Sequence, residues 1–419
     1  MNLEKYSLGI GDRFGREGAA QLRALQAAGE RGVKITPVWN KSQREHVLIG
    51  TTPTDARRAA DEAVRACGWK ESYFVDADHI GATTVDRFIE ACDFFTIDVA
   101  DEIGREARPE AVAGFKKAAS RYLGPLHLPR AEAPLELTAE AMMRAAGQYL
   151  AAVEAAALVY RRIAARKGAG NFITEISFDE SAVPQTAMDL YFILAALSFR
   201  QVAVQTIAPR FPGSFLKGID YEGDSGRFAR QFETALAVVK MASLTFDLPK
   251  DLKLSLHSGS DKFTLYPLMR DALIKADAGV HLKTAGTTWL EEVIGLAASG
   301  GEGLEAAKEV YSGALARIEE LARPYLAVIG IDKRRLPPAE EVKGWSGQEF
   351  VEALRHDPAC PKFNPDLRQL VHIGYKIAAE MGSRFTDLLE RRRDAIEPLV
   401  TANLFERHIA PLFLGASFR

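Results

Sequence analysis

Leu254-Ser-Leu-His-Ser-Gly-Ser-Asp-Lys262 joins a short apolar strand pattern to a polar, glycine-bearing loop. The run from Leu252 to Leu256 is typical of a β-strand, and His257 stands where that strand should end. Val75-Asp-Ala-Asp-His79 and Gly279-Val-His-Leu-Lys283 end two further apolar runs in a similar way. Because catalytic groups gather at the carboxyl ends of parallel strands, this repetition indicates one functional edge of a sheet.

The chain holds eight such runs, each short, rich in β-branched or aromatic residues and bounded by Gly, Pro, Asp or Ser. They are Tyr6–Gly11, Lys34–Asn40, Tyr73–Asp78, Phe94–Val99, Phe172–Phe178, Gln201–Ile207, Lys253–His257 and Gly279–Lys283. Amphipathic segments such as Gly15–Gly29 and Thr54–Cys67 lie between them. Buried strands that alternate with helices predict a parallel sheet, and eight of them favour an α/β fold of the (β/α)₈ barrel (TIM) type. A doubly wound open sheet is the alternative.

Two regions exceed a minimal barrel, which we place at residues 1–288. Residues 101–171 form an insertion after the fourth strand. It contains a helix with one apolar face, and Gly168 and Gly170 end this helix. We expect this helix to lie over the strand ends. Its face carries Ala146, Leu150, Val153, Ala157 and Tyr160. Residues 289–419 read as a helical extension that packs on the barrel or covers its mouth.

Bulk composition narrows the function. The 419 residues carry a formal net charge of −3, so there is no electrostatic case for nucleic acid, and the expected partner is a small molecule. The three cysteines form neither a CxxC pair nor a disulfide framework. The sequence shows no signal peptide and no apolar run long enough for a membrane span, so we expect a cytoplasmic protein. The sequence leaves open whether the chain forms a homo-oligomer.

Three histidines occupy matching positions at strand ends. His79, His257 and His281 would suit a divalent metal ion such as Zn, Mn, Ni or Co, with coordination positions left for substrate. The alternative is that each is a hydrogen-bonded histidine without a ligand. Four other histidines lack this context, and we expect them on the surface or in loops. They are His46, His127, His356 and His408.

Charged residues follow the same strands. Asp76 and Asp78 share one face of a strand. Glu175 points the same way as Ser177 and Asp179, and Glu180 follows at the same strand end. Each carboxylate is a candidate acid–base group or one half of a salt bridge. Five cations could together bind a carboxylate or phosphate. They are Arg13, Arg210, Lys217, Lys262 and Lys283. The glycine-rich turn Gly9–Gly15 is spaced GxGxxxG and lacks an acidic residue after the next strand, so a tight turn is favoured over a dinucleotide site.

With these motifs, the chain resembles the tagaturonate epimerase family. The matching segments are Gly9–Gly15, Asp76–His79, Phe95–Asp98, Glu175–Glu180, Lys217–Tyr221 with Gly223-Asp224, Leu254–Phe263, His281–Thr287 and Arg368–Tyr375. They run in order from the start of the chain to about residue 376, and Leu254–Phe263 is the most specific of them.

The resemblance implies a divalent-metal epimerase that interconverts D-tagaturonate and D-fructuronate. It implies His79, His257 and His281 as metal ligands, Asp78 as proton acceptor and Glu175 as proton donor. We add a set of candidate substrate-binding residues: Asp12, Arg13, Asn40, Arg210, Lys217, Asp261, Lys262, Lys283, Gln369 and His372. Three alternatives stay open: a tagatose/fructose 4-epimerase acting on neutral ketohexoses, a metal-dependent sugar isomerase or aldolase, and a barrel that binds sugar without turnover.

Overall fold

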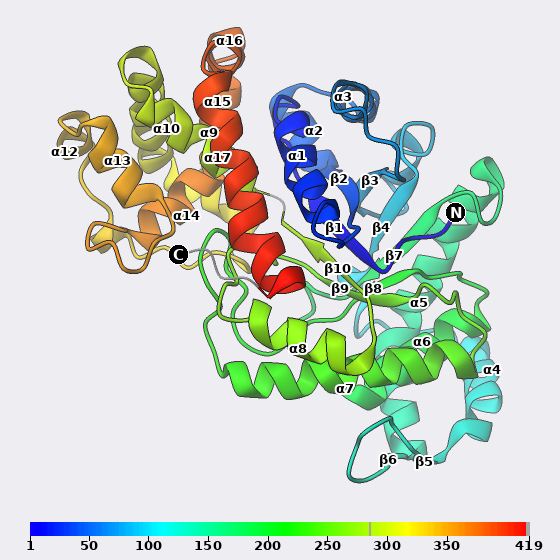
Figure 1. The fold of residues 1–419 in the computed structure, drawn as a ribbon. Helices are drawn as coiled ribbons and strands as arrows, with labels where there is room; N and C mark the ends of the chain where they lie inside the picture. The colour runs from blue at the N-terminus through cyan, green and yellow to red at the C-terminus, as the bar shows by residue number, and fades with distance from the viewer. Residues whose placement is uncertain (285, 416–419) are drawn as a thin grey trace.

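A closed barrel of eight parallel strands forms the centre of the protein (Figure 1). The computed structural model describes residues 1–284 and 286–415. In order around the barrel, the strands are β1 (Tyr6–Ile10), β10 (Val280–Lys283), β9 (Lys253–Leu256), β8 (Thr206–Ala208), β7 (Ile173–Ser177), β4 (Phe94–Asp98), β3 (Phe74–Ile80) and β2 (Thr36–Ser42). The closed order confirms the barrel and excludes the open sheet.

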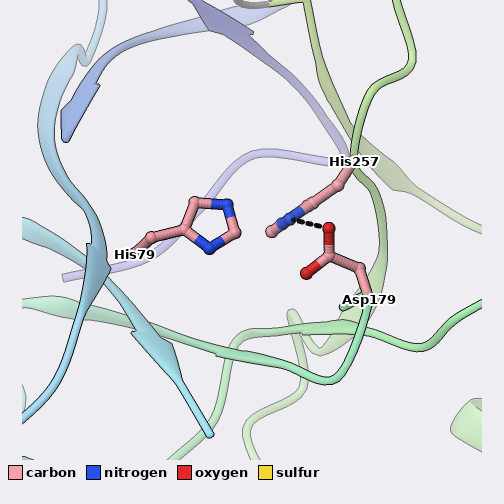
Figure 2. A group of neighbouring side chains, drawn as sticks. All are labelled: His79, Asp179 and His257. Carbon is pink, nitrogen blue, oxygen red and sulfur yellow. Dashed lines mark ion pairs between the residues drawn. The ribbon is translucent and has the colours of Figure 1, made fainter. Parts of the chain in front are cut away.

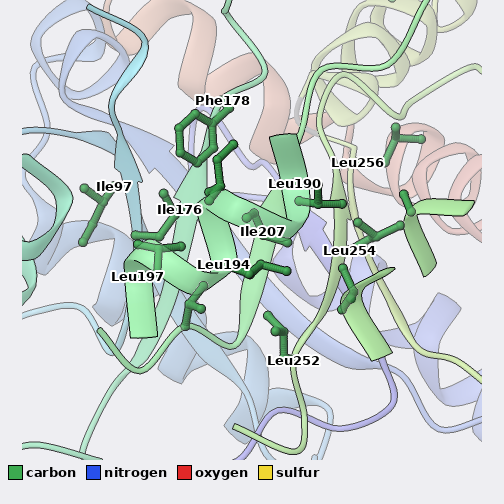
Figure 3. Close-up of a cluster of buried hydrophobic side chains, with 14 of the residues drawn as sticks. Ile97, Ile176, Phe178, Leu190, Leu194, Leu197, Ile207, Leu252, Leu254 and Leu256 are labelled. Carbon is green, nitrogen blue, oxygen red and sulfur yellow. The ribbon is translucent and has the colours of Figure 1, made fainter. Parts of the chain in front are cut away.

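Alternation along the strands separates an apolar outer surface from a polar interior. Leu254 and Leu256 of β9 belong to the large core outside the barrel, whereas Ser255 between them is level with His281 of β10. In that outer core, Leu190, Leu194 and Leu197 of the neighbouring helix lie against Ile176 and Ile207 (Figure 3). The two-residue period therefore points the polar residues of these strands into the barrel.

Glycine at position 9 makes room for this interior. Gly9 of β1 is level with Lys283, and a Cβ at Gly9 would lie 2.8 Å from the Lys283 Cγ. No side chain larger than hydrogen fits there unless Lys283 moves.

Helices join most of the strands and form the outer layer. They are α1 (Gly18–Gly29), α2 (Gln43–Ile49), α3 (Pro53–Ala66), α4 (Pro109–Ala119), α5 (Ala139–Lys167), α6 (Ala187–Phe199), α7 (Ser225–Thr245) and α8 (Tyr266–Ala276). The link between β3 and β4 contains only the 3₁₀ turn Val85–Arg87. Local sequence sets several boundaries: Thr186 and Asp189 form a capping box at the start of α6.

The insertion after β4 comprises α4, the antiparallel pair β5 (Gly124–Leu126) and β6 (Leu135–Leu137), and the long helix α5. The predicted apolar face of α5 is buried, and the helix ends at Gly168, whose φ is 81°. However, α5 packs against α4, α6 and β4. The helix therefore belongs to the outer layer of the barrel rather than to a cover over the strand ends.

The C-terminal region has its own core but returns to the barrel. Its helices are α9 (Thr287–Ala298), α10 (Gly301–Ala316), α11 (Ile318–Ala322), α12 (Ala339–Lys343), α13 (Gly347–Leu354), α14 (Pro365–Ile373), α15 (Tyr375–Glu380), α16 (Ser383–Arg391), α17 (Arg393–Ala402) and the π-helix Asn403–Leu414. Helix α9 follows β10 yet packs against α10, α13 and α17, away from the barrel wall.

The π-helix takes the place that the eighth barrel helix would have. It packs against both α1 and α8, and Leu404, Ile409 and Leu412 are buried in the barrel core. Figure 1 shows the C-terminal helix running down beside α1 to the end of α8. The expected boundary, with the barrel at residues 1–288 and the extension at 289–419, therefore assigns one of the helices around the barrel to the extension. Within the described residues, no helix combines the length and apolarity that crossing a membrane requires.

Candidate active site

A cavity of about 420 Å³ opens at the carboxyl ends of the barrel strands. Residues in the last part of β2, β3, β4 and β10 and residues that follow β1, β7 and β9 line it, and Pro324, Tyr325 and Val328 of the C-terminal region contribute one wall. The strand-end side chains in the lining are Arg13, Asn40, Asp78, His79, Asp98, Asp179, Glu180, His257 and Lys283. The predicted edge of the barrel is thus a single polar pocket.

His79 and His257 face each other across this pocket, with Asp179 beside them (Figure 2). Their ring centroids are 5.2 Å apart. Asp98 Oδ2 lies 2.7 Å from the Nδ1 atom of His79, and Asp179 Oδ2 lies 3.1 Å from the Nδ1 atom of His257. A register shift in β3 and a φ of 50° at His79 turn this side chain toward the pocket.

The electrostatics of this cluster favour a cation. Burial would lower the pKa of His79, but Asp78, Asp98 and Asp179 raise it to about 10. Burial likewise opposes a proton on His257, while Asp179 and Glu175 raise the pKa of its ring to about 9. The carboxylates around the two rings therefore favour positive charge at this point of the pocket.

The same groups have the geometry of a metal site. Ligand atoms of His79, Asp179 and His257 lie within 4.8 Å of one another, and so do those of His79, Asp98 and Glu180. Two imidazole nitrogens with carboxylate oxygens are suitable ligands for Zn²⁺, Mn²⁺, Ni²⁺ or Co²⁺. The residues present therefore fit the divalent cofactor that the sequence led us to expect.

His281 does not belong to either group. It lies in the middle of β10, fully buried, with Nδ1 2.8 Å from the hydroxyl oxygen of Ser7. Its Nε2 has no hydrogen-bond partner among the residues described, and burial lowers the pKa of the ring to about 3. His281 is therefore a neutral ring one layer beneath Lys283. The place beside His79 and His257 that we expected for His281 is taken by Asp179.

Lys283 is the buried cation at the floor of the pocket. Its Nζ lies 2.9 Å from Asp76 Oδ2, 2.7 Å from Asp78 Oδ1 and 3.0 Å from Glu175 Oε1. Burial would lower its pKa, but these three carboxylates raise the pKa well above the ordinary value. Lys283 thus joins both candidate catalytic carboxylates through one ammonium group.

The two carboxylates differ in access to the pocket. Asp78 lines the cavity, and Lys283 and His79 lower the pKa of its carboxyl despite burial. Glu175 is completely buried and accepts hydrogen bonds from Thr206 and Thr96, with His257 Nε2 at 2.7 Å. Glu175 therefore reaches the pocket only through Lys283 and His257.

Of the proposed substrate-binding residues, Arg13, Asn40, Lys217 and Lys283 line the cavity. Nε and Nη1 of Arg13 and both amide atoms of Asn40 are buried without hydrogen-bond partners in the described structure. Arg210 lines a smaller cavity next to it, which shares Asp179 and His257 with the first. Unpaired buried polar atoms are costly, so Arg13 and Asn40 are candidates for contact with a ligand.

The other five proposed substrate contacts do not line this cavity. Asp12 accepts hydrogen bonds from the backbone N–H groups of Gly15, Arg16 and Glu17 and so caps the glycine turn. Gln369 accepts one from Gly330, and His372 packs against Gly286.

Asp261 and Lys262 are completely buried. The ammonium of Lys262 donates to the carbonyls of Leu216, Ile219 and Ser260, and Asp261 pairs with Arg368. Both residues therefore hold the loop after His257 in place through buried contacts outside the cavity.

The structure gives some residues a different place from the one expected. Asp179 and Glu180, which directly follow the fifth barrel strand, were expected at the strand ends but without an assigned role. His46 and His408 are buried in helices, so the expectation of surface or loop positions is wrong for them, whereas His127 is exposed and His356 lies in a loop, although it is buried there. His408 accepts a hydrogen bond from the backbone N–H of Asp261, which explains its burial.

A parallel barrel with acid–base groups and paired imidazoles at its carboxyl edge defines a (β/α)₈-barrel enzyme. A sequence profile of the UxaE tagaturonate epimerase family matches residues 1–411. The chain belongs to the tagaturonate epimerase family and is therefore an epimerase of the isomerase class, as the motifs indicated.

Individual relatives agree with this assignment. The tagaturonate/fructuronate epimerase of Thermotoga maritima is 29% identical over 96% of this chain and 80% of that protein. The native crystal structure of the fructuronate-tagaturonate epimerase from Cohnella laeviribosi superposes with a TM-score of 0.80 at 24% identity, covering 98% of this chain and 82% of that one. Its glycerol complex gives the same values. The structural likeness shows that the fold is shared.

Proposed function

We propose that this protein interconverts D-tagaturonate and D-fructuronate by inverting the configuration at C4. Family membership and the activity named for its relatives support the substrate. The observation that carries the proposal is the contact of Lys283 with both Asp78 and Glu175 at the floor of the pocket. This arrangement provides two connected proton-transfer groups next to a cation-attracting cluster.

The chemistry of the substrate selects the route. C4 lies β to the C2 ketone, so its C–H bond is not acidified by that carbonyl and simple enolisation does not invert it. Retro-aldol cleavage of the C3–C4 bond, rotation of the aldehyde fragment and aldol re-addition on its other face do. No net proton or electron is consumed, because the proton lost from the C4 hydroxyl is returned to the new C4 alkoxide.

We assign the first proton transfer to Asp78, whose lowered pKa keeps it ionised as a base. A proton accepted there can pass to Glu175 or return through Lys283, whose ammonium contacts both carboxylates. Glu175 is buried, so as the proton donor it acts through Lys283 rather than by touching the substrate. The ammonium also stabilises negative charge that develops at C4.

The enediolate formed by cleavage needs a counter-charge at the ketone end. A divalent metal ion held by His79, His257 and Asp179 would supply Lewis acidity there. The carboxylate of Asp98 orients the His79 imidazole through its Nδ1 atom. Tyr325 and Val328 cover one side of the cavity and limit access of water to the reacting fragments.

The test compares initial rates of the metal-loaded protein on D-tagaturonate, D-fructuronate, D-tagatose and D-fructose. We expect the two uronates to interconvert fastest. Faster turnover of the neutral ketoses would show that these sugars, and not the uronates, are the substrates. Accumulation of trapped three-carbon fragments would show that the enzyme is an aldolase.

Isotopic labelling tests the route separately. Deuterium at C4 should be fully retained in the product made in ordinary water, because the C4–H bond never breaks. Solvent exchange at C4 would contradict the retro-aldol route without affecting the substrate assignment.

A further inference from the structure

We propose that Arg13, held in place by Tyr375 of the C-terminal region, is the receptor for the substrate carboxylate and determines that the enzyme takes uronates rather than neutral ketoses. This inference rests on the proposed function, because it names the part of the same pocket that recognises the acid group.

Arg13 has free hydrogen-bonding capacity where a ligand would bind. The side chain follows β1, is 5% exposed and lines the cavity. Its Nε and Nη1 have no hydrogen-bond partner among the described residues, whereas Nη2 lies 3.5 Å from His372 Nε2 and 3.7 Å from Glu45 Oε1. An unpaired guanidinium N–H can donate a charge-assisted hydrogen bond to a carboxylate oxygen.

The C-terminal region fixes the orientation of this guanidinium. The ring of Tyr375 lies 3.8 Å from the Arg13 guanidinium carbon, and the hydroxyl of Tyr375 is 2.8 Å from that of Tyr325. The Lys41 ammonium donates to the Arg13 carbonyl at 2.6 Å. Stacking on one face leaves the edge of the planar group available, so the receptor is prepared before the ligand arrives.

The position of Arg13 across the barrel suits a hexuronate. In the closed strand order, β1 stands diametrically opposite β7, so Arg13 and Asp179 enter the pocket from opposite sides of the mouth. In a 2-keto-hexuronate, C4 lies midway between the C2 ketone and the C6 carboxylate. A substrate held at the ketone near Asp179 and at the carboxylate near Arg13 would place C4 between the two ends.

Asn40 completes the receptor beside Arg13. It lies in β2, the strand next to β1, and both its amide oxygen and its amide nitrogen are buried without partners in the described part of the chain. An amide that can both donate and accept suits a substrate hydroxyl next to the carboxylate.

The experiment compares Arg13→Met with Arg16→Met, a matched change of an exposed arginine in the same loop. Binding of D-tagaturonate and D-tagatose is measured by calorimetry in an Asp78→Asn background, and kcat and KM are measured in the otherwise unchanged enzyme. We expect Arg13→Met to weaken tagaturonate binding and raise its KM by about 10- to 150-fold, the range of a charge-assisted hydrogen bond, with little effect on tagatose. Arg16→Met should change neither.

Tyr375 gives a second, graded readout of positioning. Tyr375→Leu removes the stacked ring and should raise KM for the uronate with a smaller effect on kcat, whereas Tyr375→Phe keeps the ring and should largely restore KM. Unchanged tagaturonate affinity in Arg13→Met, or equal losses for tagatose and tagaturonate, would overturn the inference. If the wild-type protein binds tagaturonate through Arg13 but does not epimerise it, the receptor stands and the proposed function fails.

Discussion

Arg368 and Asp261 form a completely buried ion pair in which Nη2 of the arginine lies 2.9 Å from Oδ2 of the aspartate. The pair connects α14 of the C-terminal region to the loop that follows His257. Arg368 also donates to the carbonyls of Gly218 and Leu354, and the backbone N–H of Asp261 donates to His408. One side chain therefore holds the barrel loops and the helical extension together behind the pocket.

Replacing Arg368 with Met should strongly destabilise the protein. The substitution leaves the Asp261 carboxylate buried without its counter-charge, and removing one partner of a buried pair costs about 3–5 kcal/mol. Urea unfolding measures this change. Arg334→Met, which removes an exposed ion pair with Asp332, serves as the control and should leave the unfolding midpoint unchanged. A loss below about 1 kcal/mol in Arg368→Met would show that the pair does not support the loop.

Truncating Ile409 tests whether the π-helix is part of the barrel. Ile409 is fully buried in the core that also contains Ile207 of β8. We expect Ile409→Ala to cost about 2–5 kcal/mol, similar to Ile207→Ala, and both variants to unfold in one transition. Leu326→Ala, at a 72% exposed position, should have little effect. A separate early transition in Ile409→Ala would mean that the C-terminal helix unfolds independently of the barrel.

Glu17 should make stability fall as the pH rises. Burial raises its pKa to about 8, and Asp12 and Glu397 add to this effect. In the unfolded chain the pKa of a glutamate is about 4.3. Between this pH and pH 8 the unfolded state has therefore lost a proton that the folded state keeps. The free energy of unfolding therefore decreases across this window, by up to about 1.4 kcal/mol per pH unit.

Glu17→Gln should remove that slope, because glutamine does not titrate. Urea unfolding of wild type and variant at pH 5.5, 7.0 and 8.5 gives the difference directly, and we expect the variant to gain relative stability toward pH 8.5. Glu132→Gln, at an exposed position, controls for the loss of one negative charge. A difference that does not vary with pH would contradict the raised pKa.

Removal of divalent metal should abolish turnover, since the proposed mechanism needs a counter-charge for the enediolate. We expect chelation to reduce activity by more than about 100-fold and added Mn²⁺, Co²⁺, Ni²⁺ or Zn²⁺ to restore it. His257→Ala should lose metal in elemental analysis while retaining its circular dichroism spectrum. His127→Ala, an exposed histidine outside the site, should keep both metal and activity. Full metal content in His257→Ala would remove this residue from the ligand set.

Residues close together in the sequence were enough to predict the strands and the polar edge. Leu254-Ser-Leu-His257 alternates apolar and polar side chains, and this two-residue period alone assigns one set to the outer core and the other to the barrel interior. Short-range signals of this kind also placed Asp78, Glu175 and Lys283 on a common edge. The same reasoning predicted the end of α5 at Gly168, where only a local backbone change is needed.

What local pattern could not determine was which of these side chains meet. Strict alternation would turn His79 away from Asp78, but the register shift in β3 brings both into the pocket. His281 and Lys283 share one face, and their different depths leave the histidine beneath the site. Tyr375 stacks on Arg13, and the π-helix closes the barrel beside α1, across more than 350 residues of sequence. The sequence by itself determined strands, faces and chemical groups, because these follow from periodicity and residue type. Only tertiary structure decided partners and depth, because they depend on strand register and on packing between distant segments.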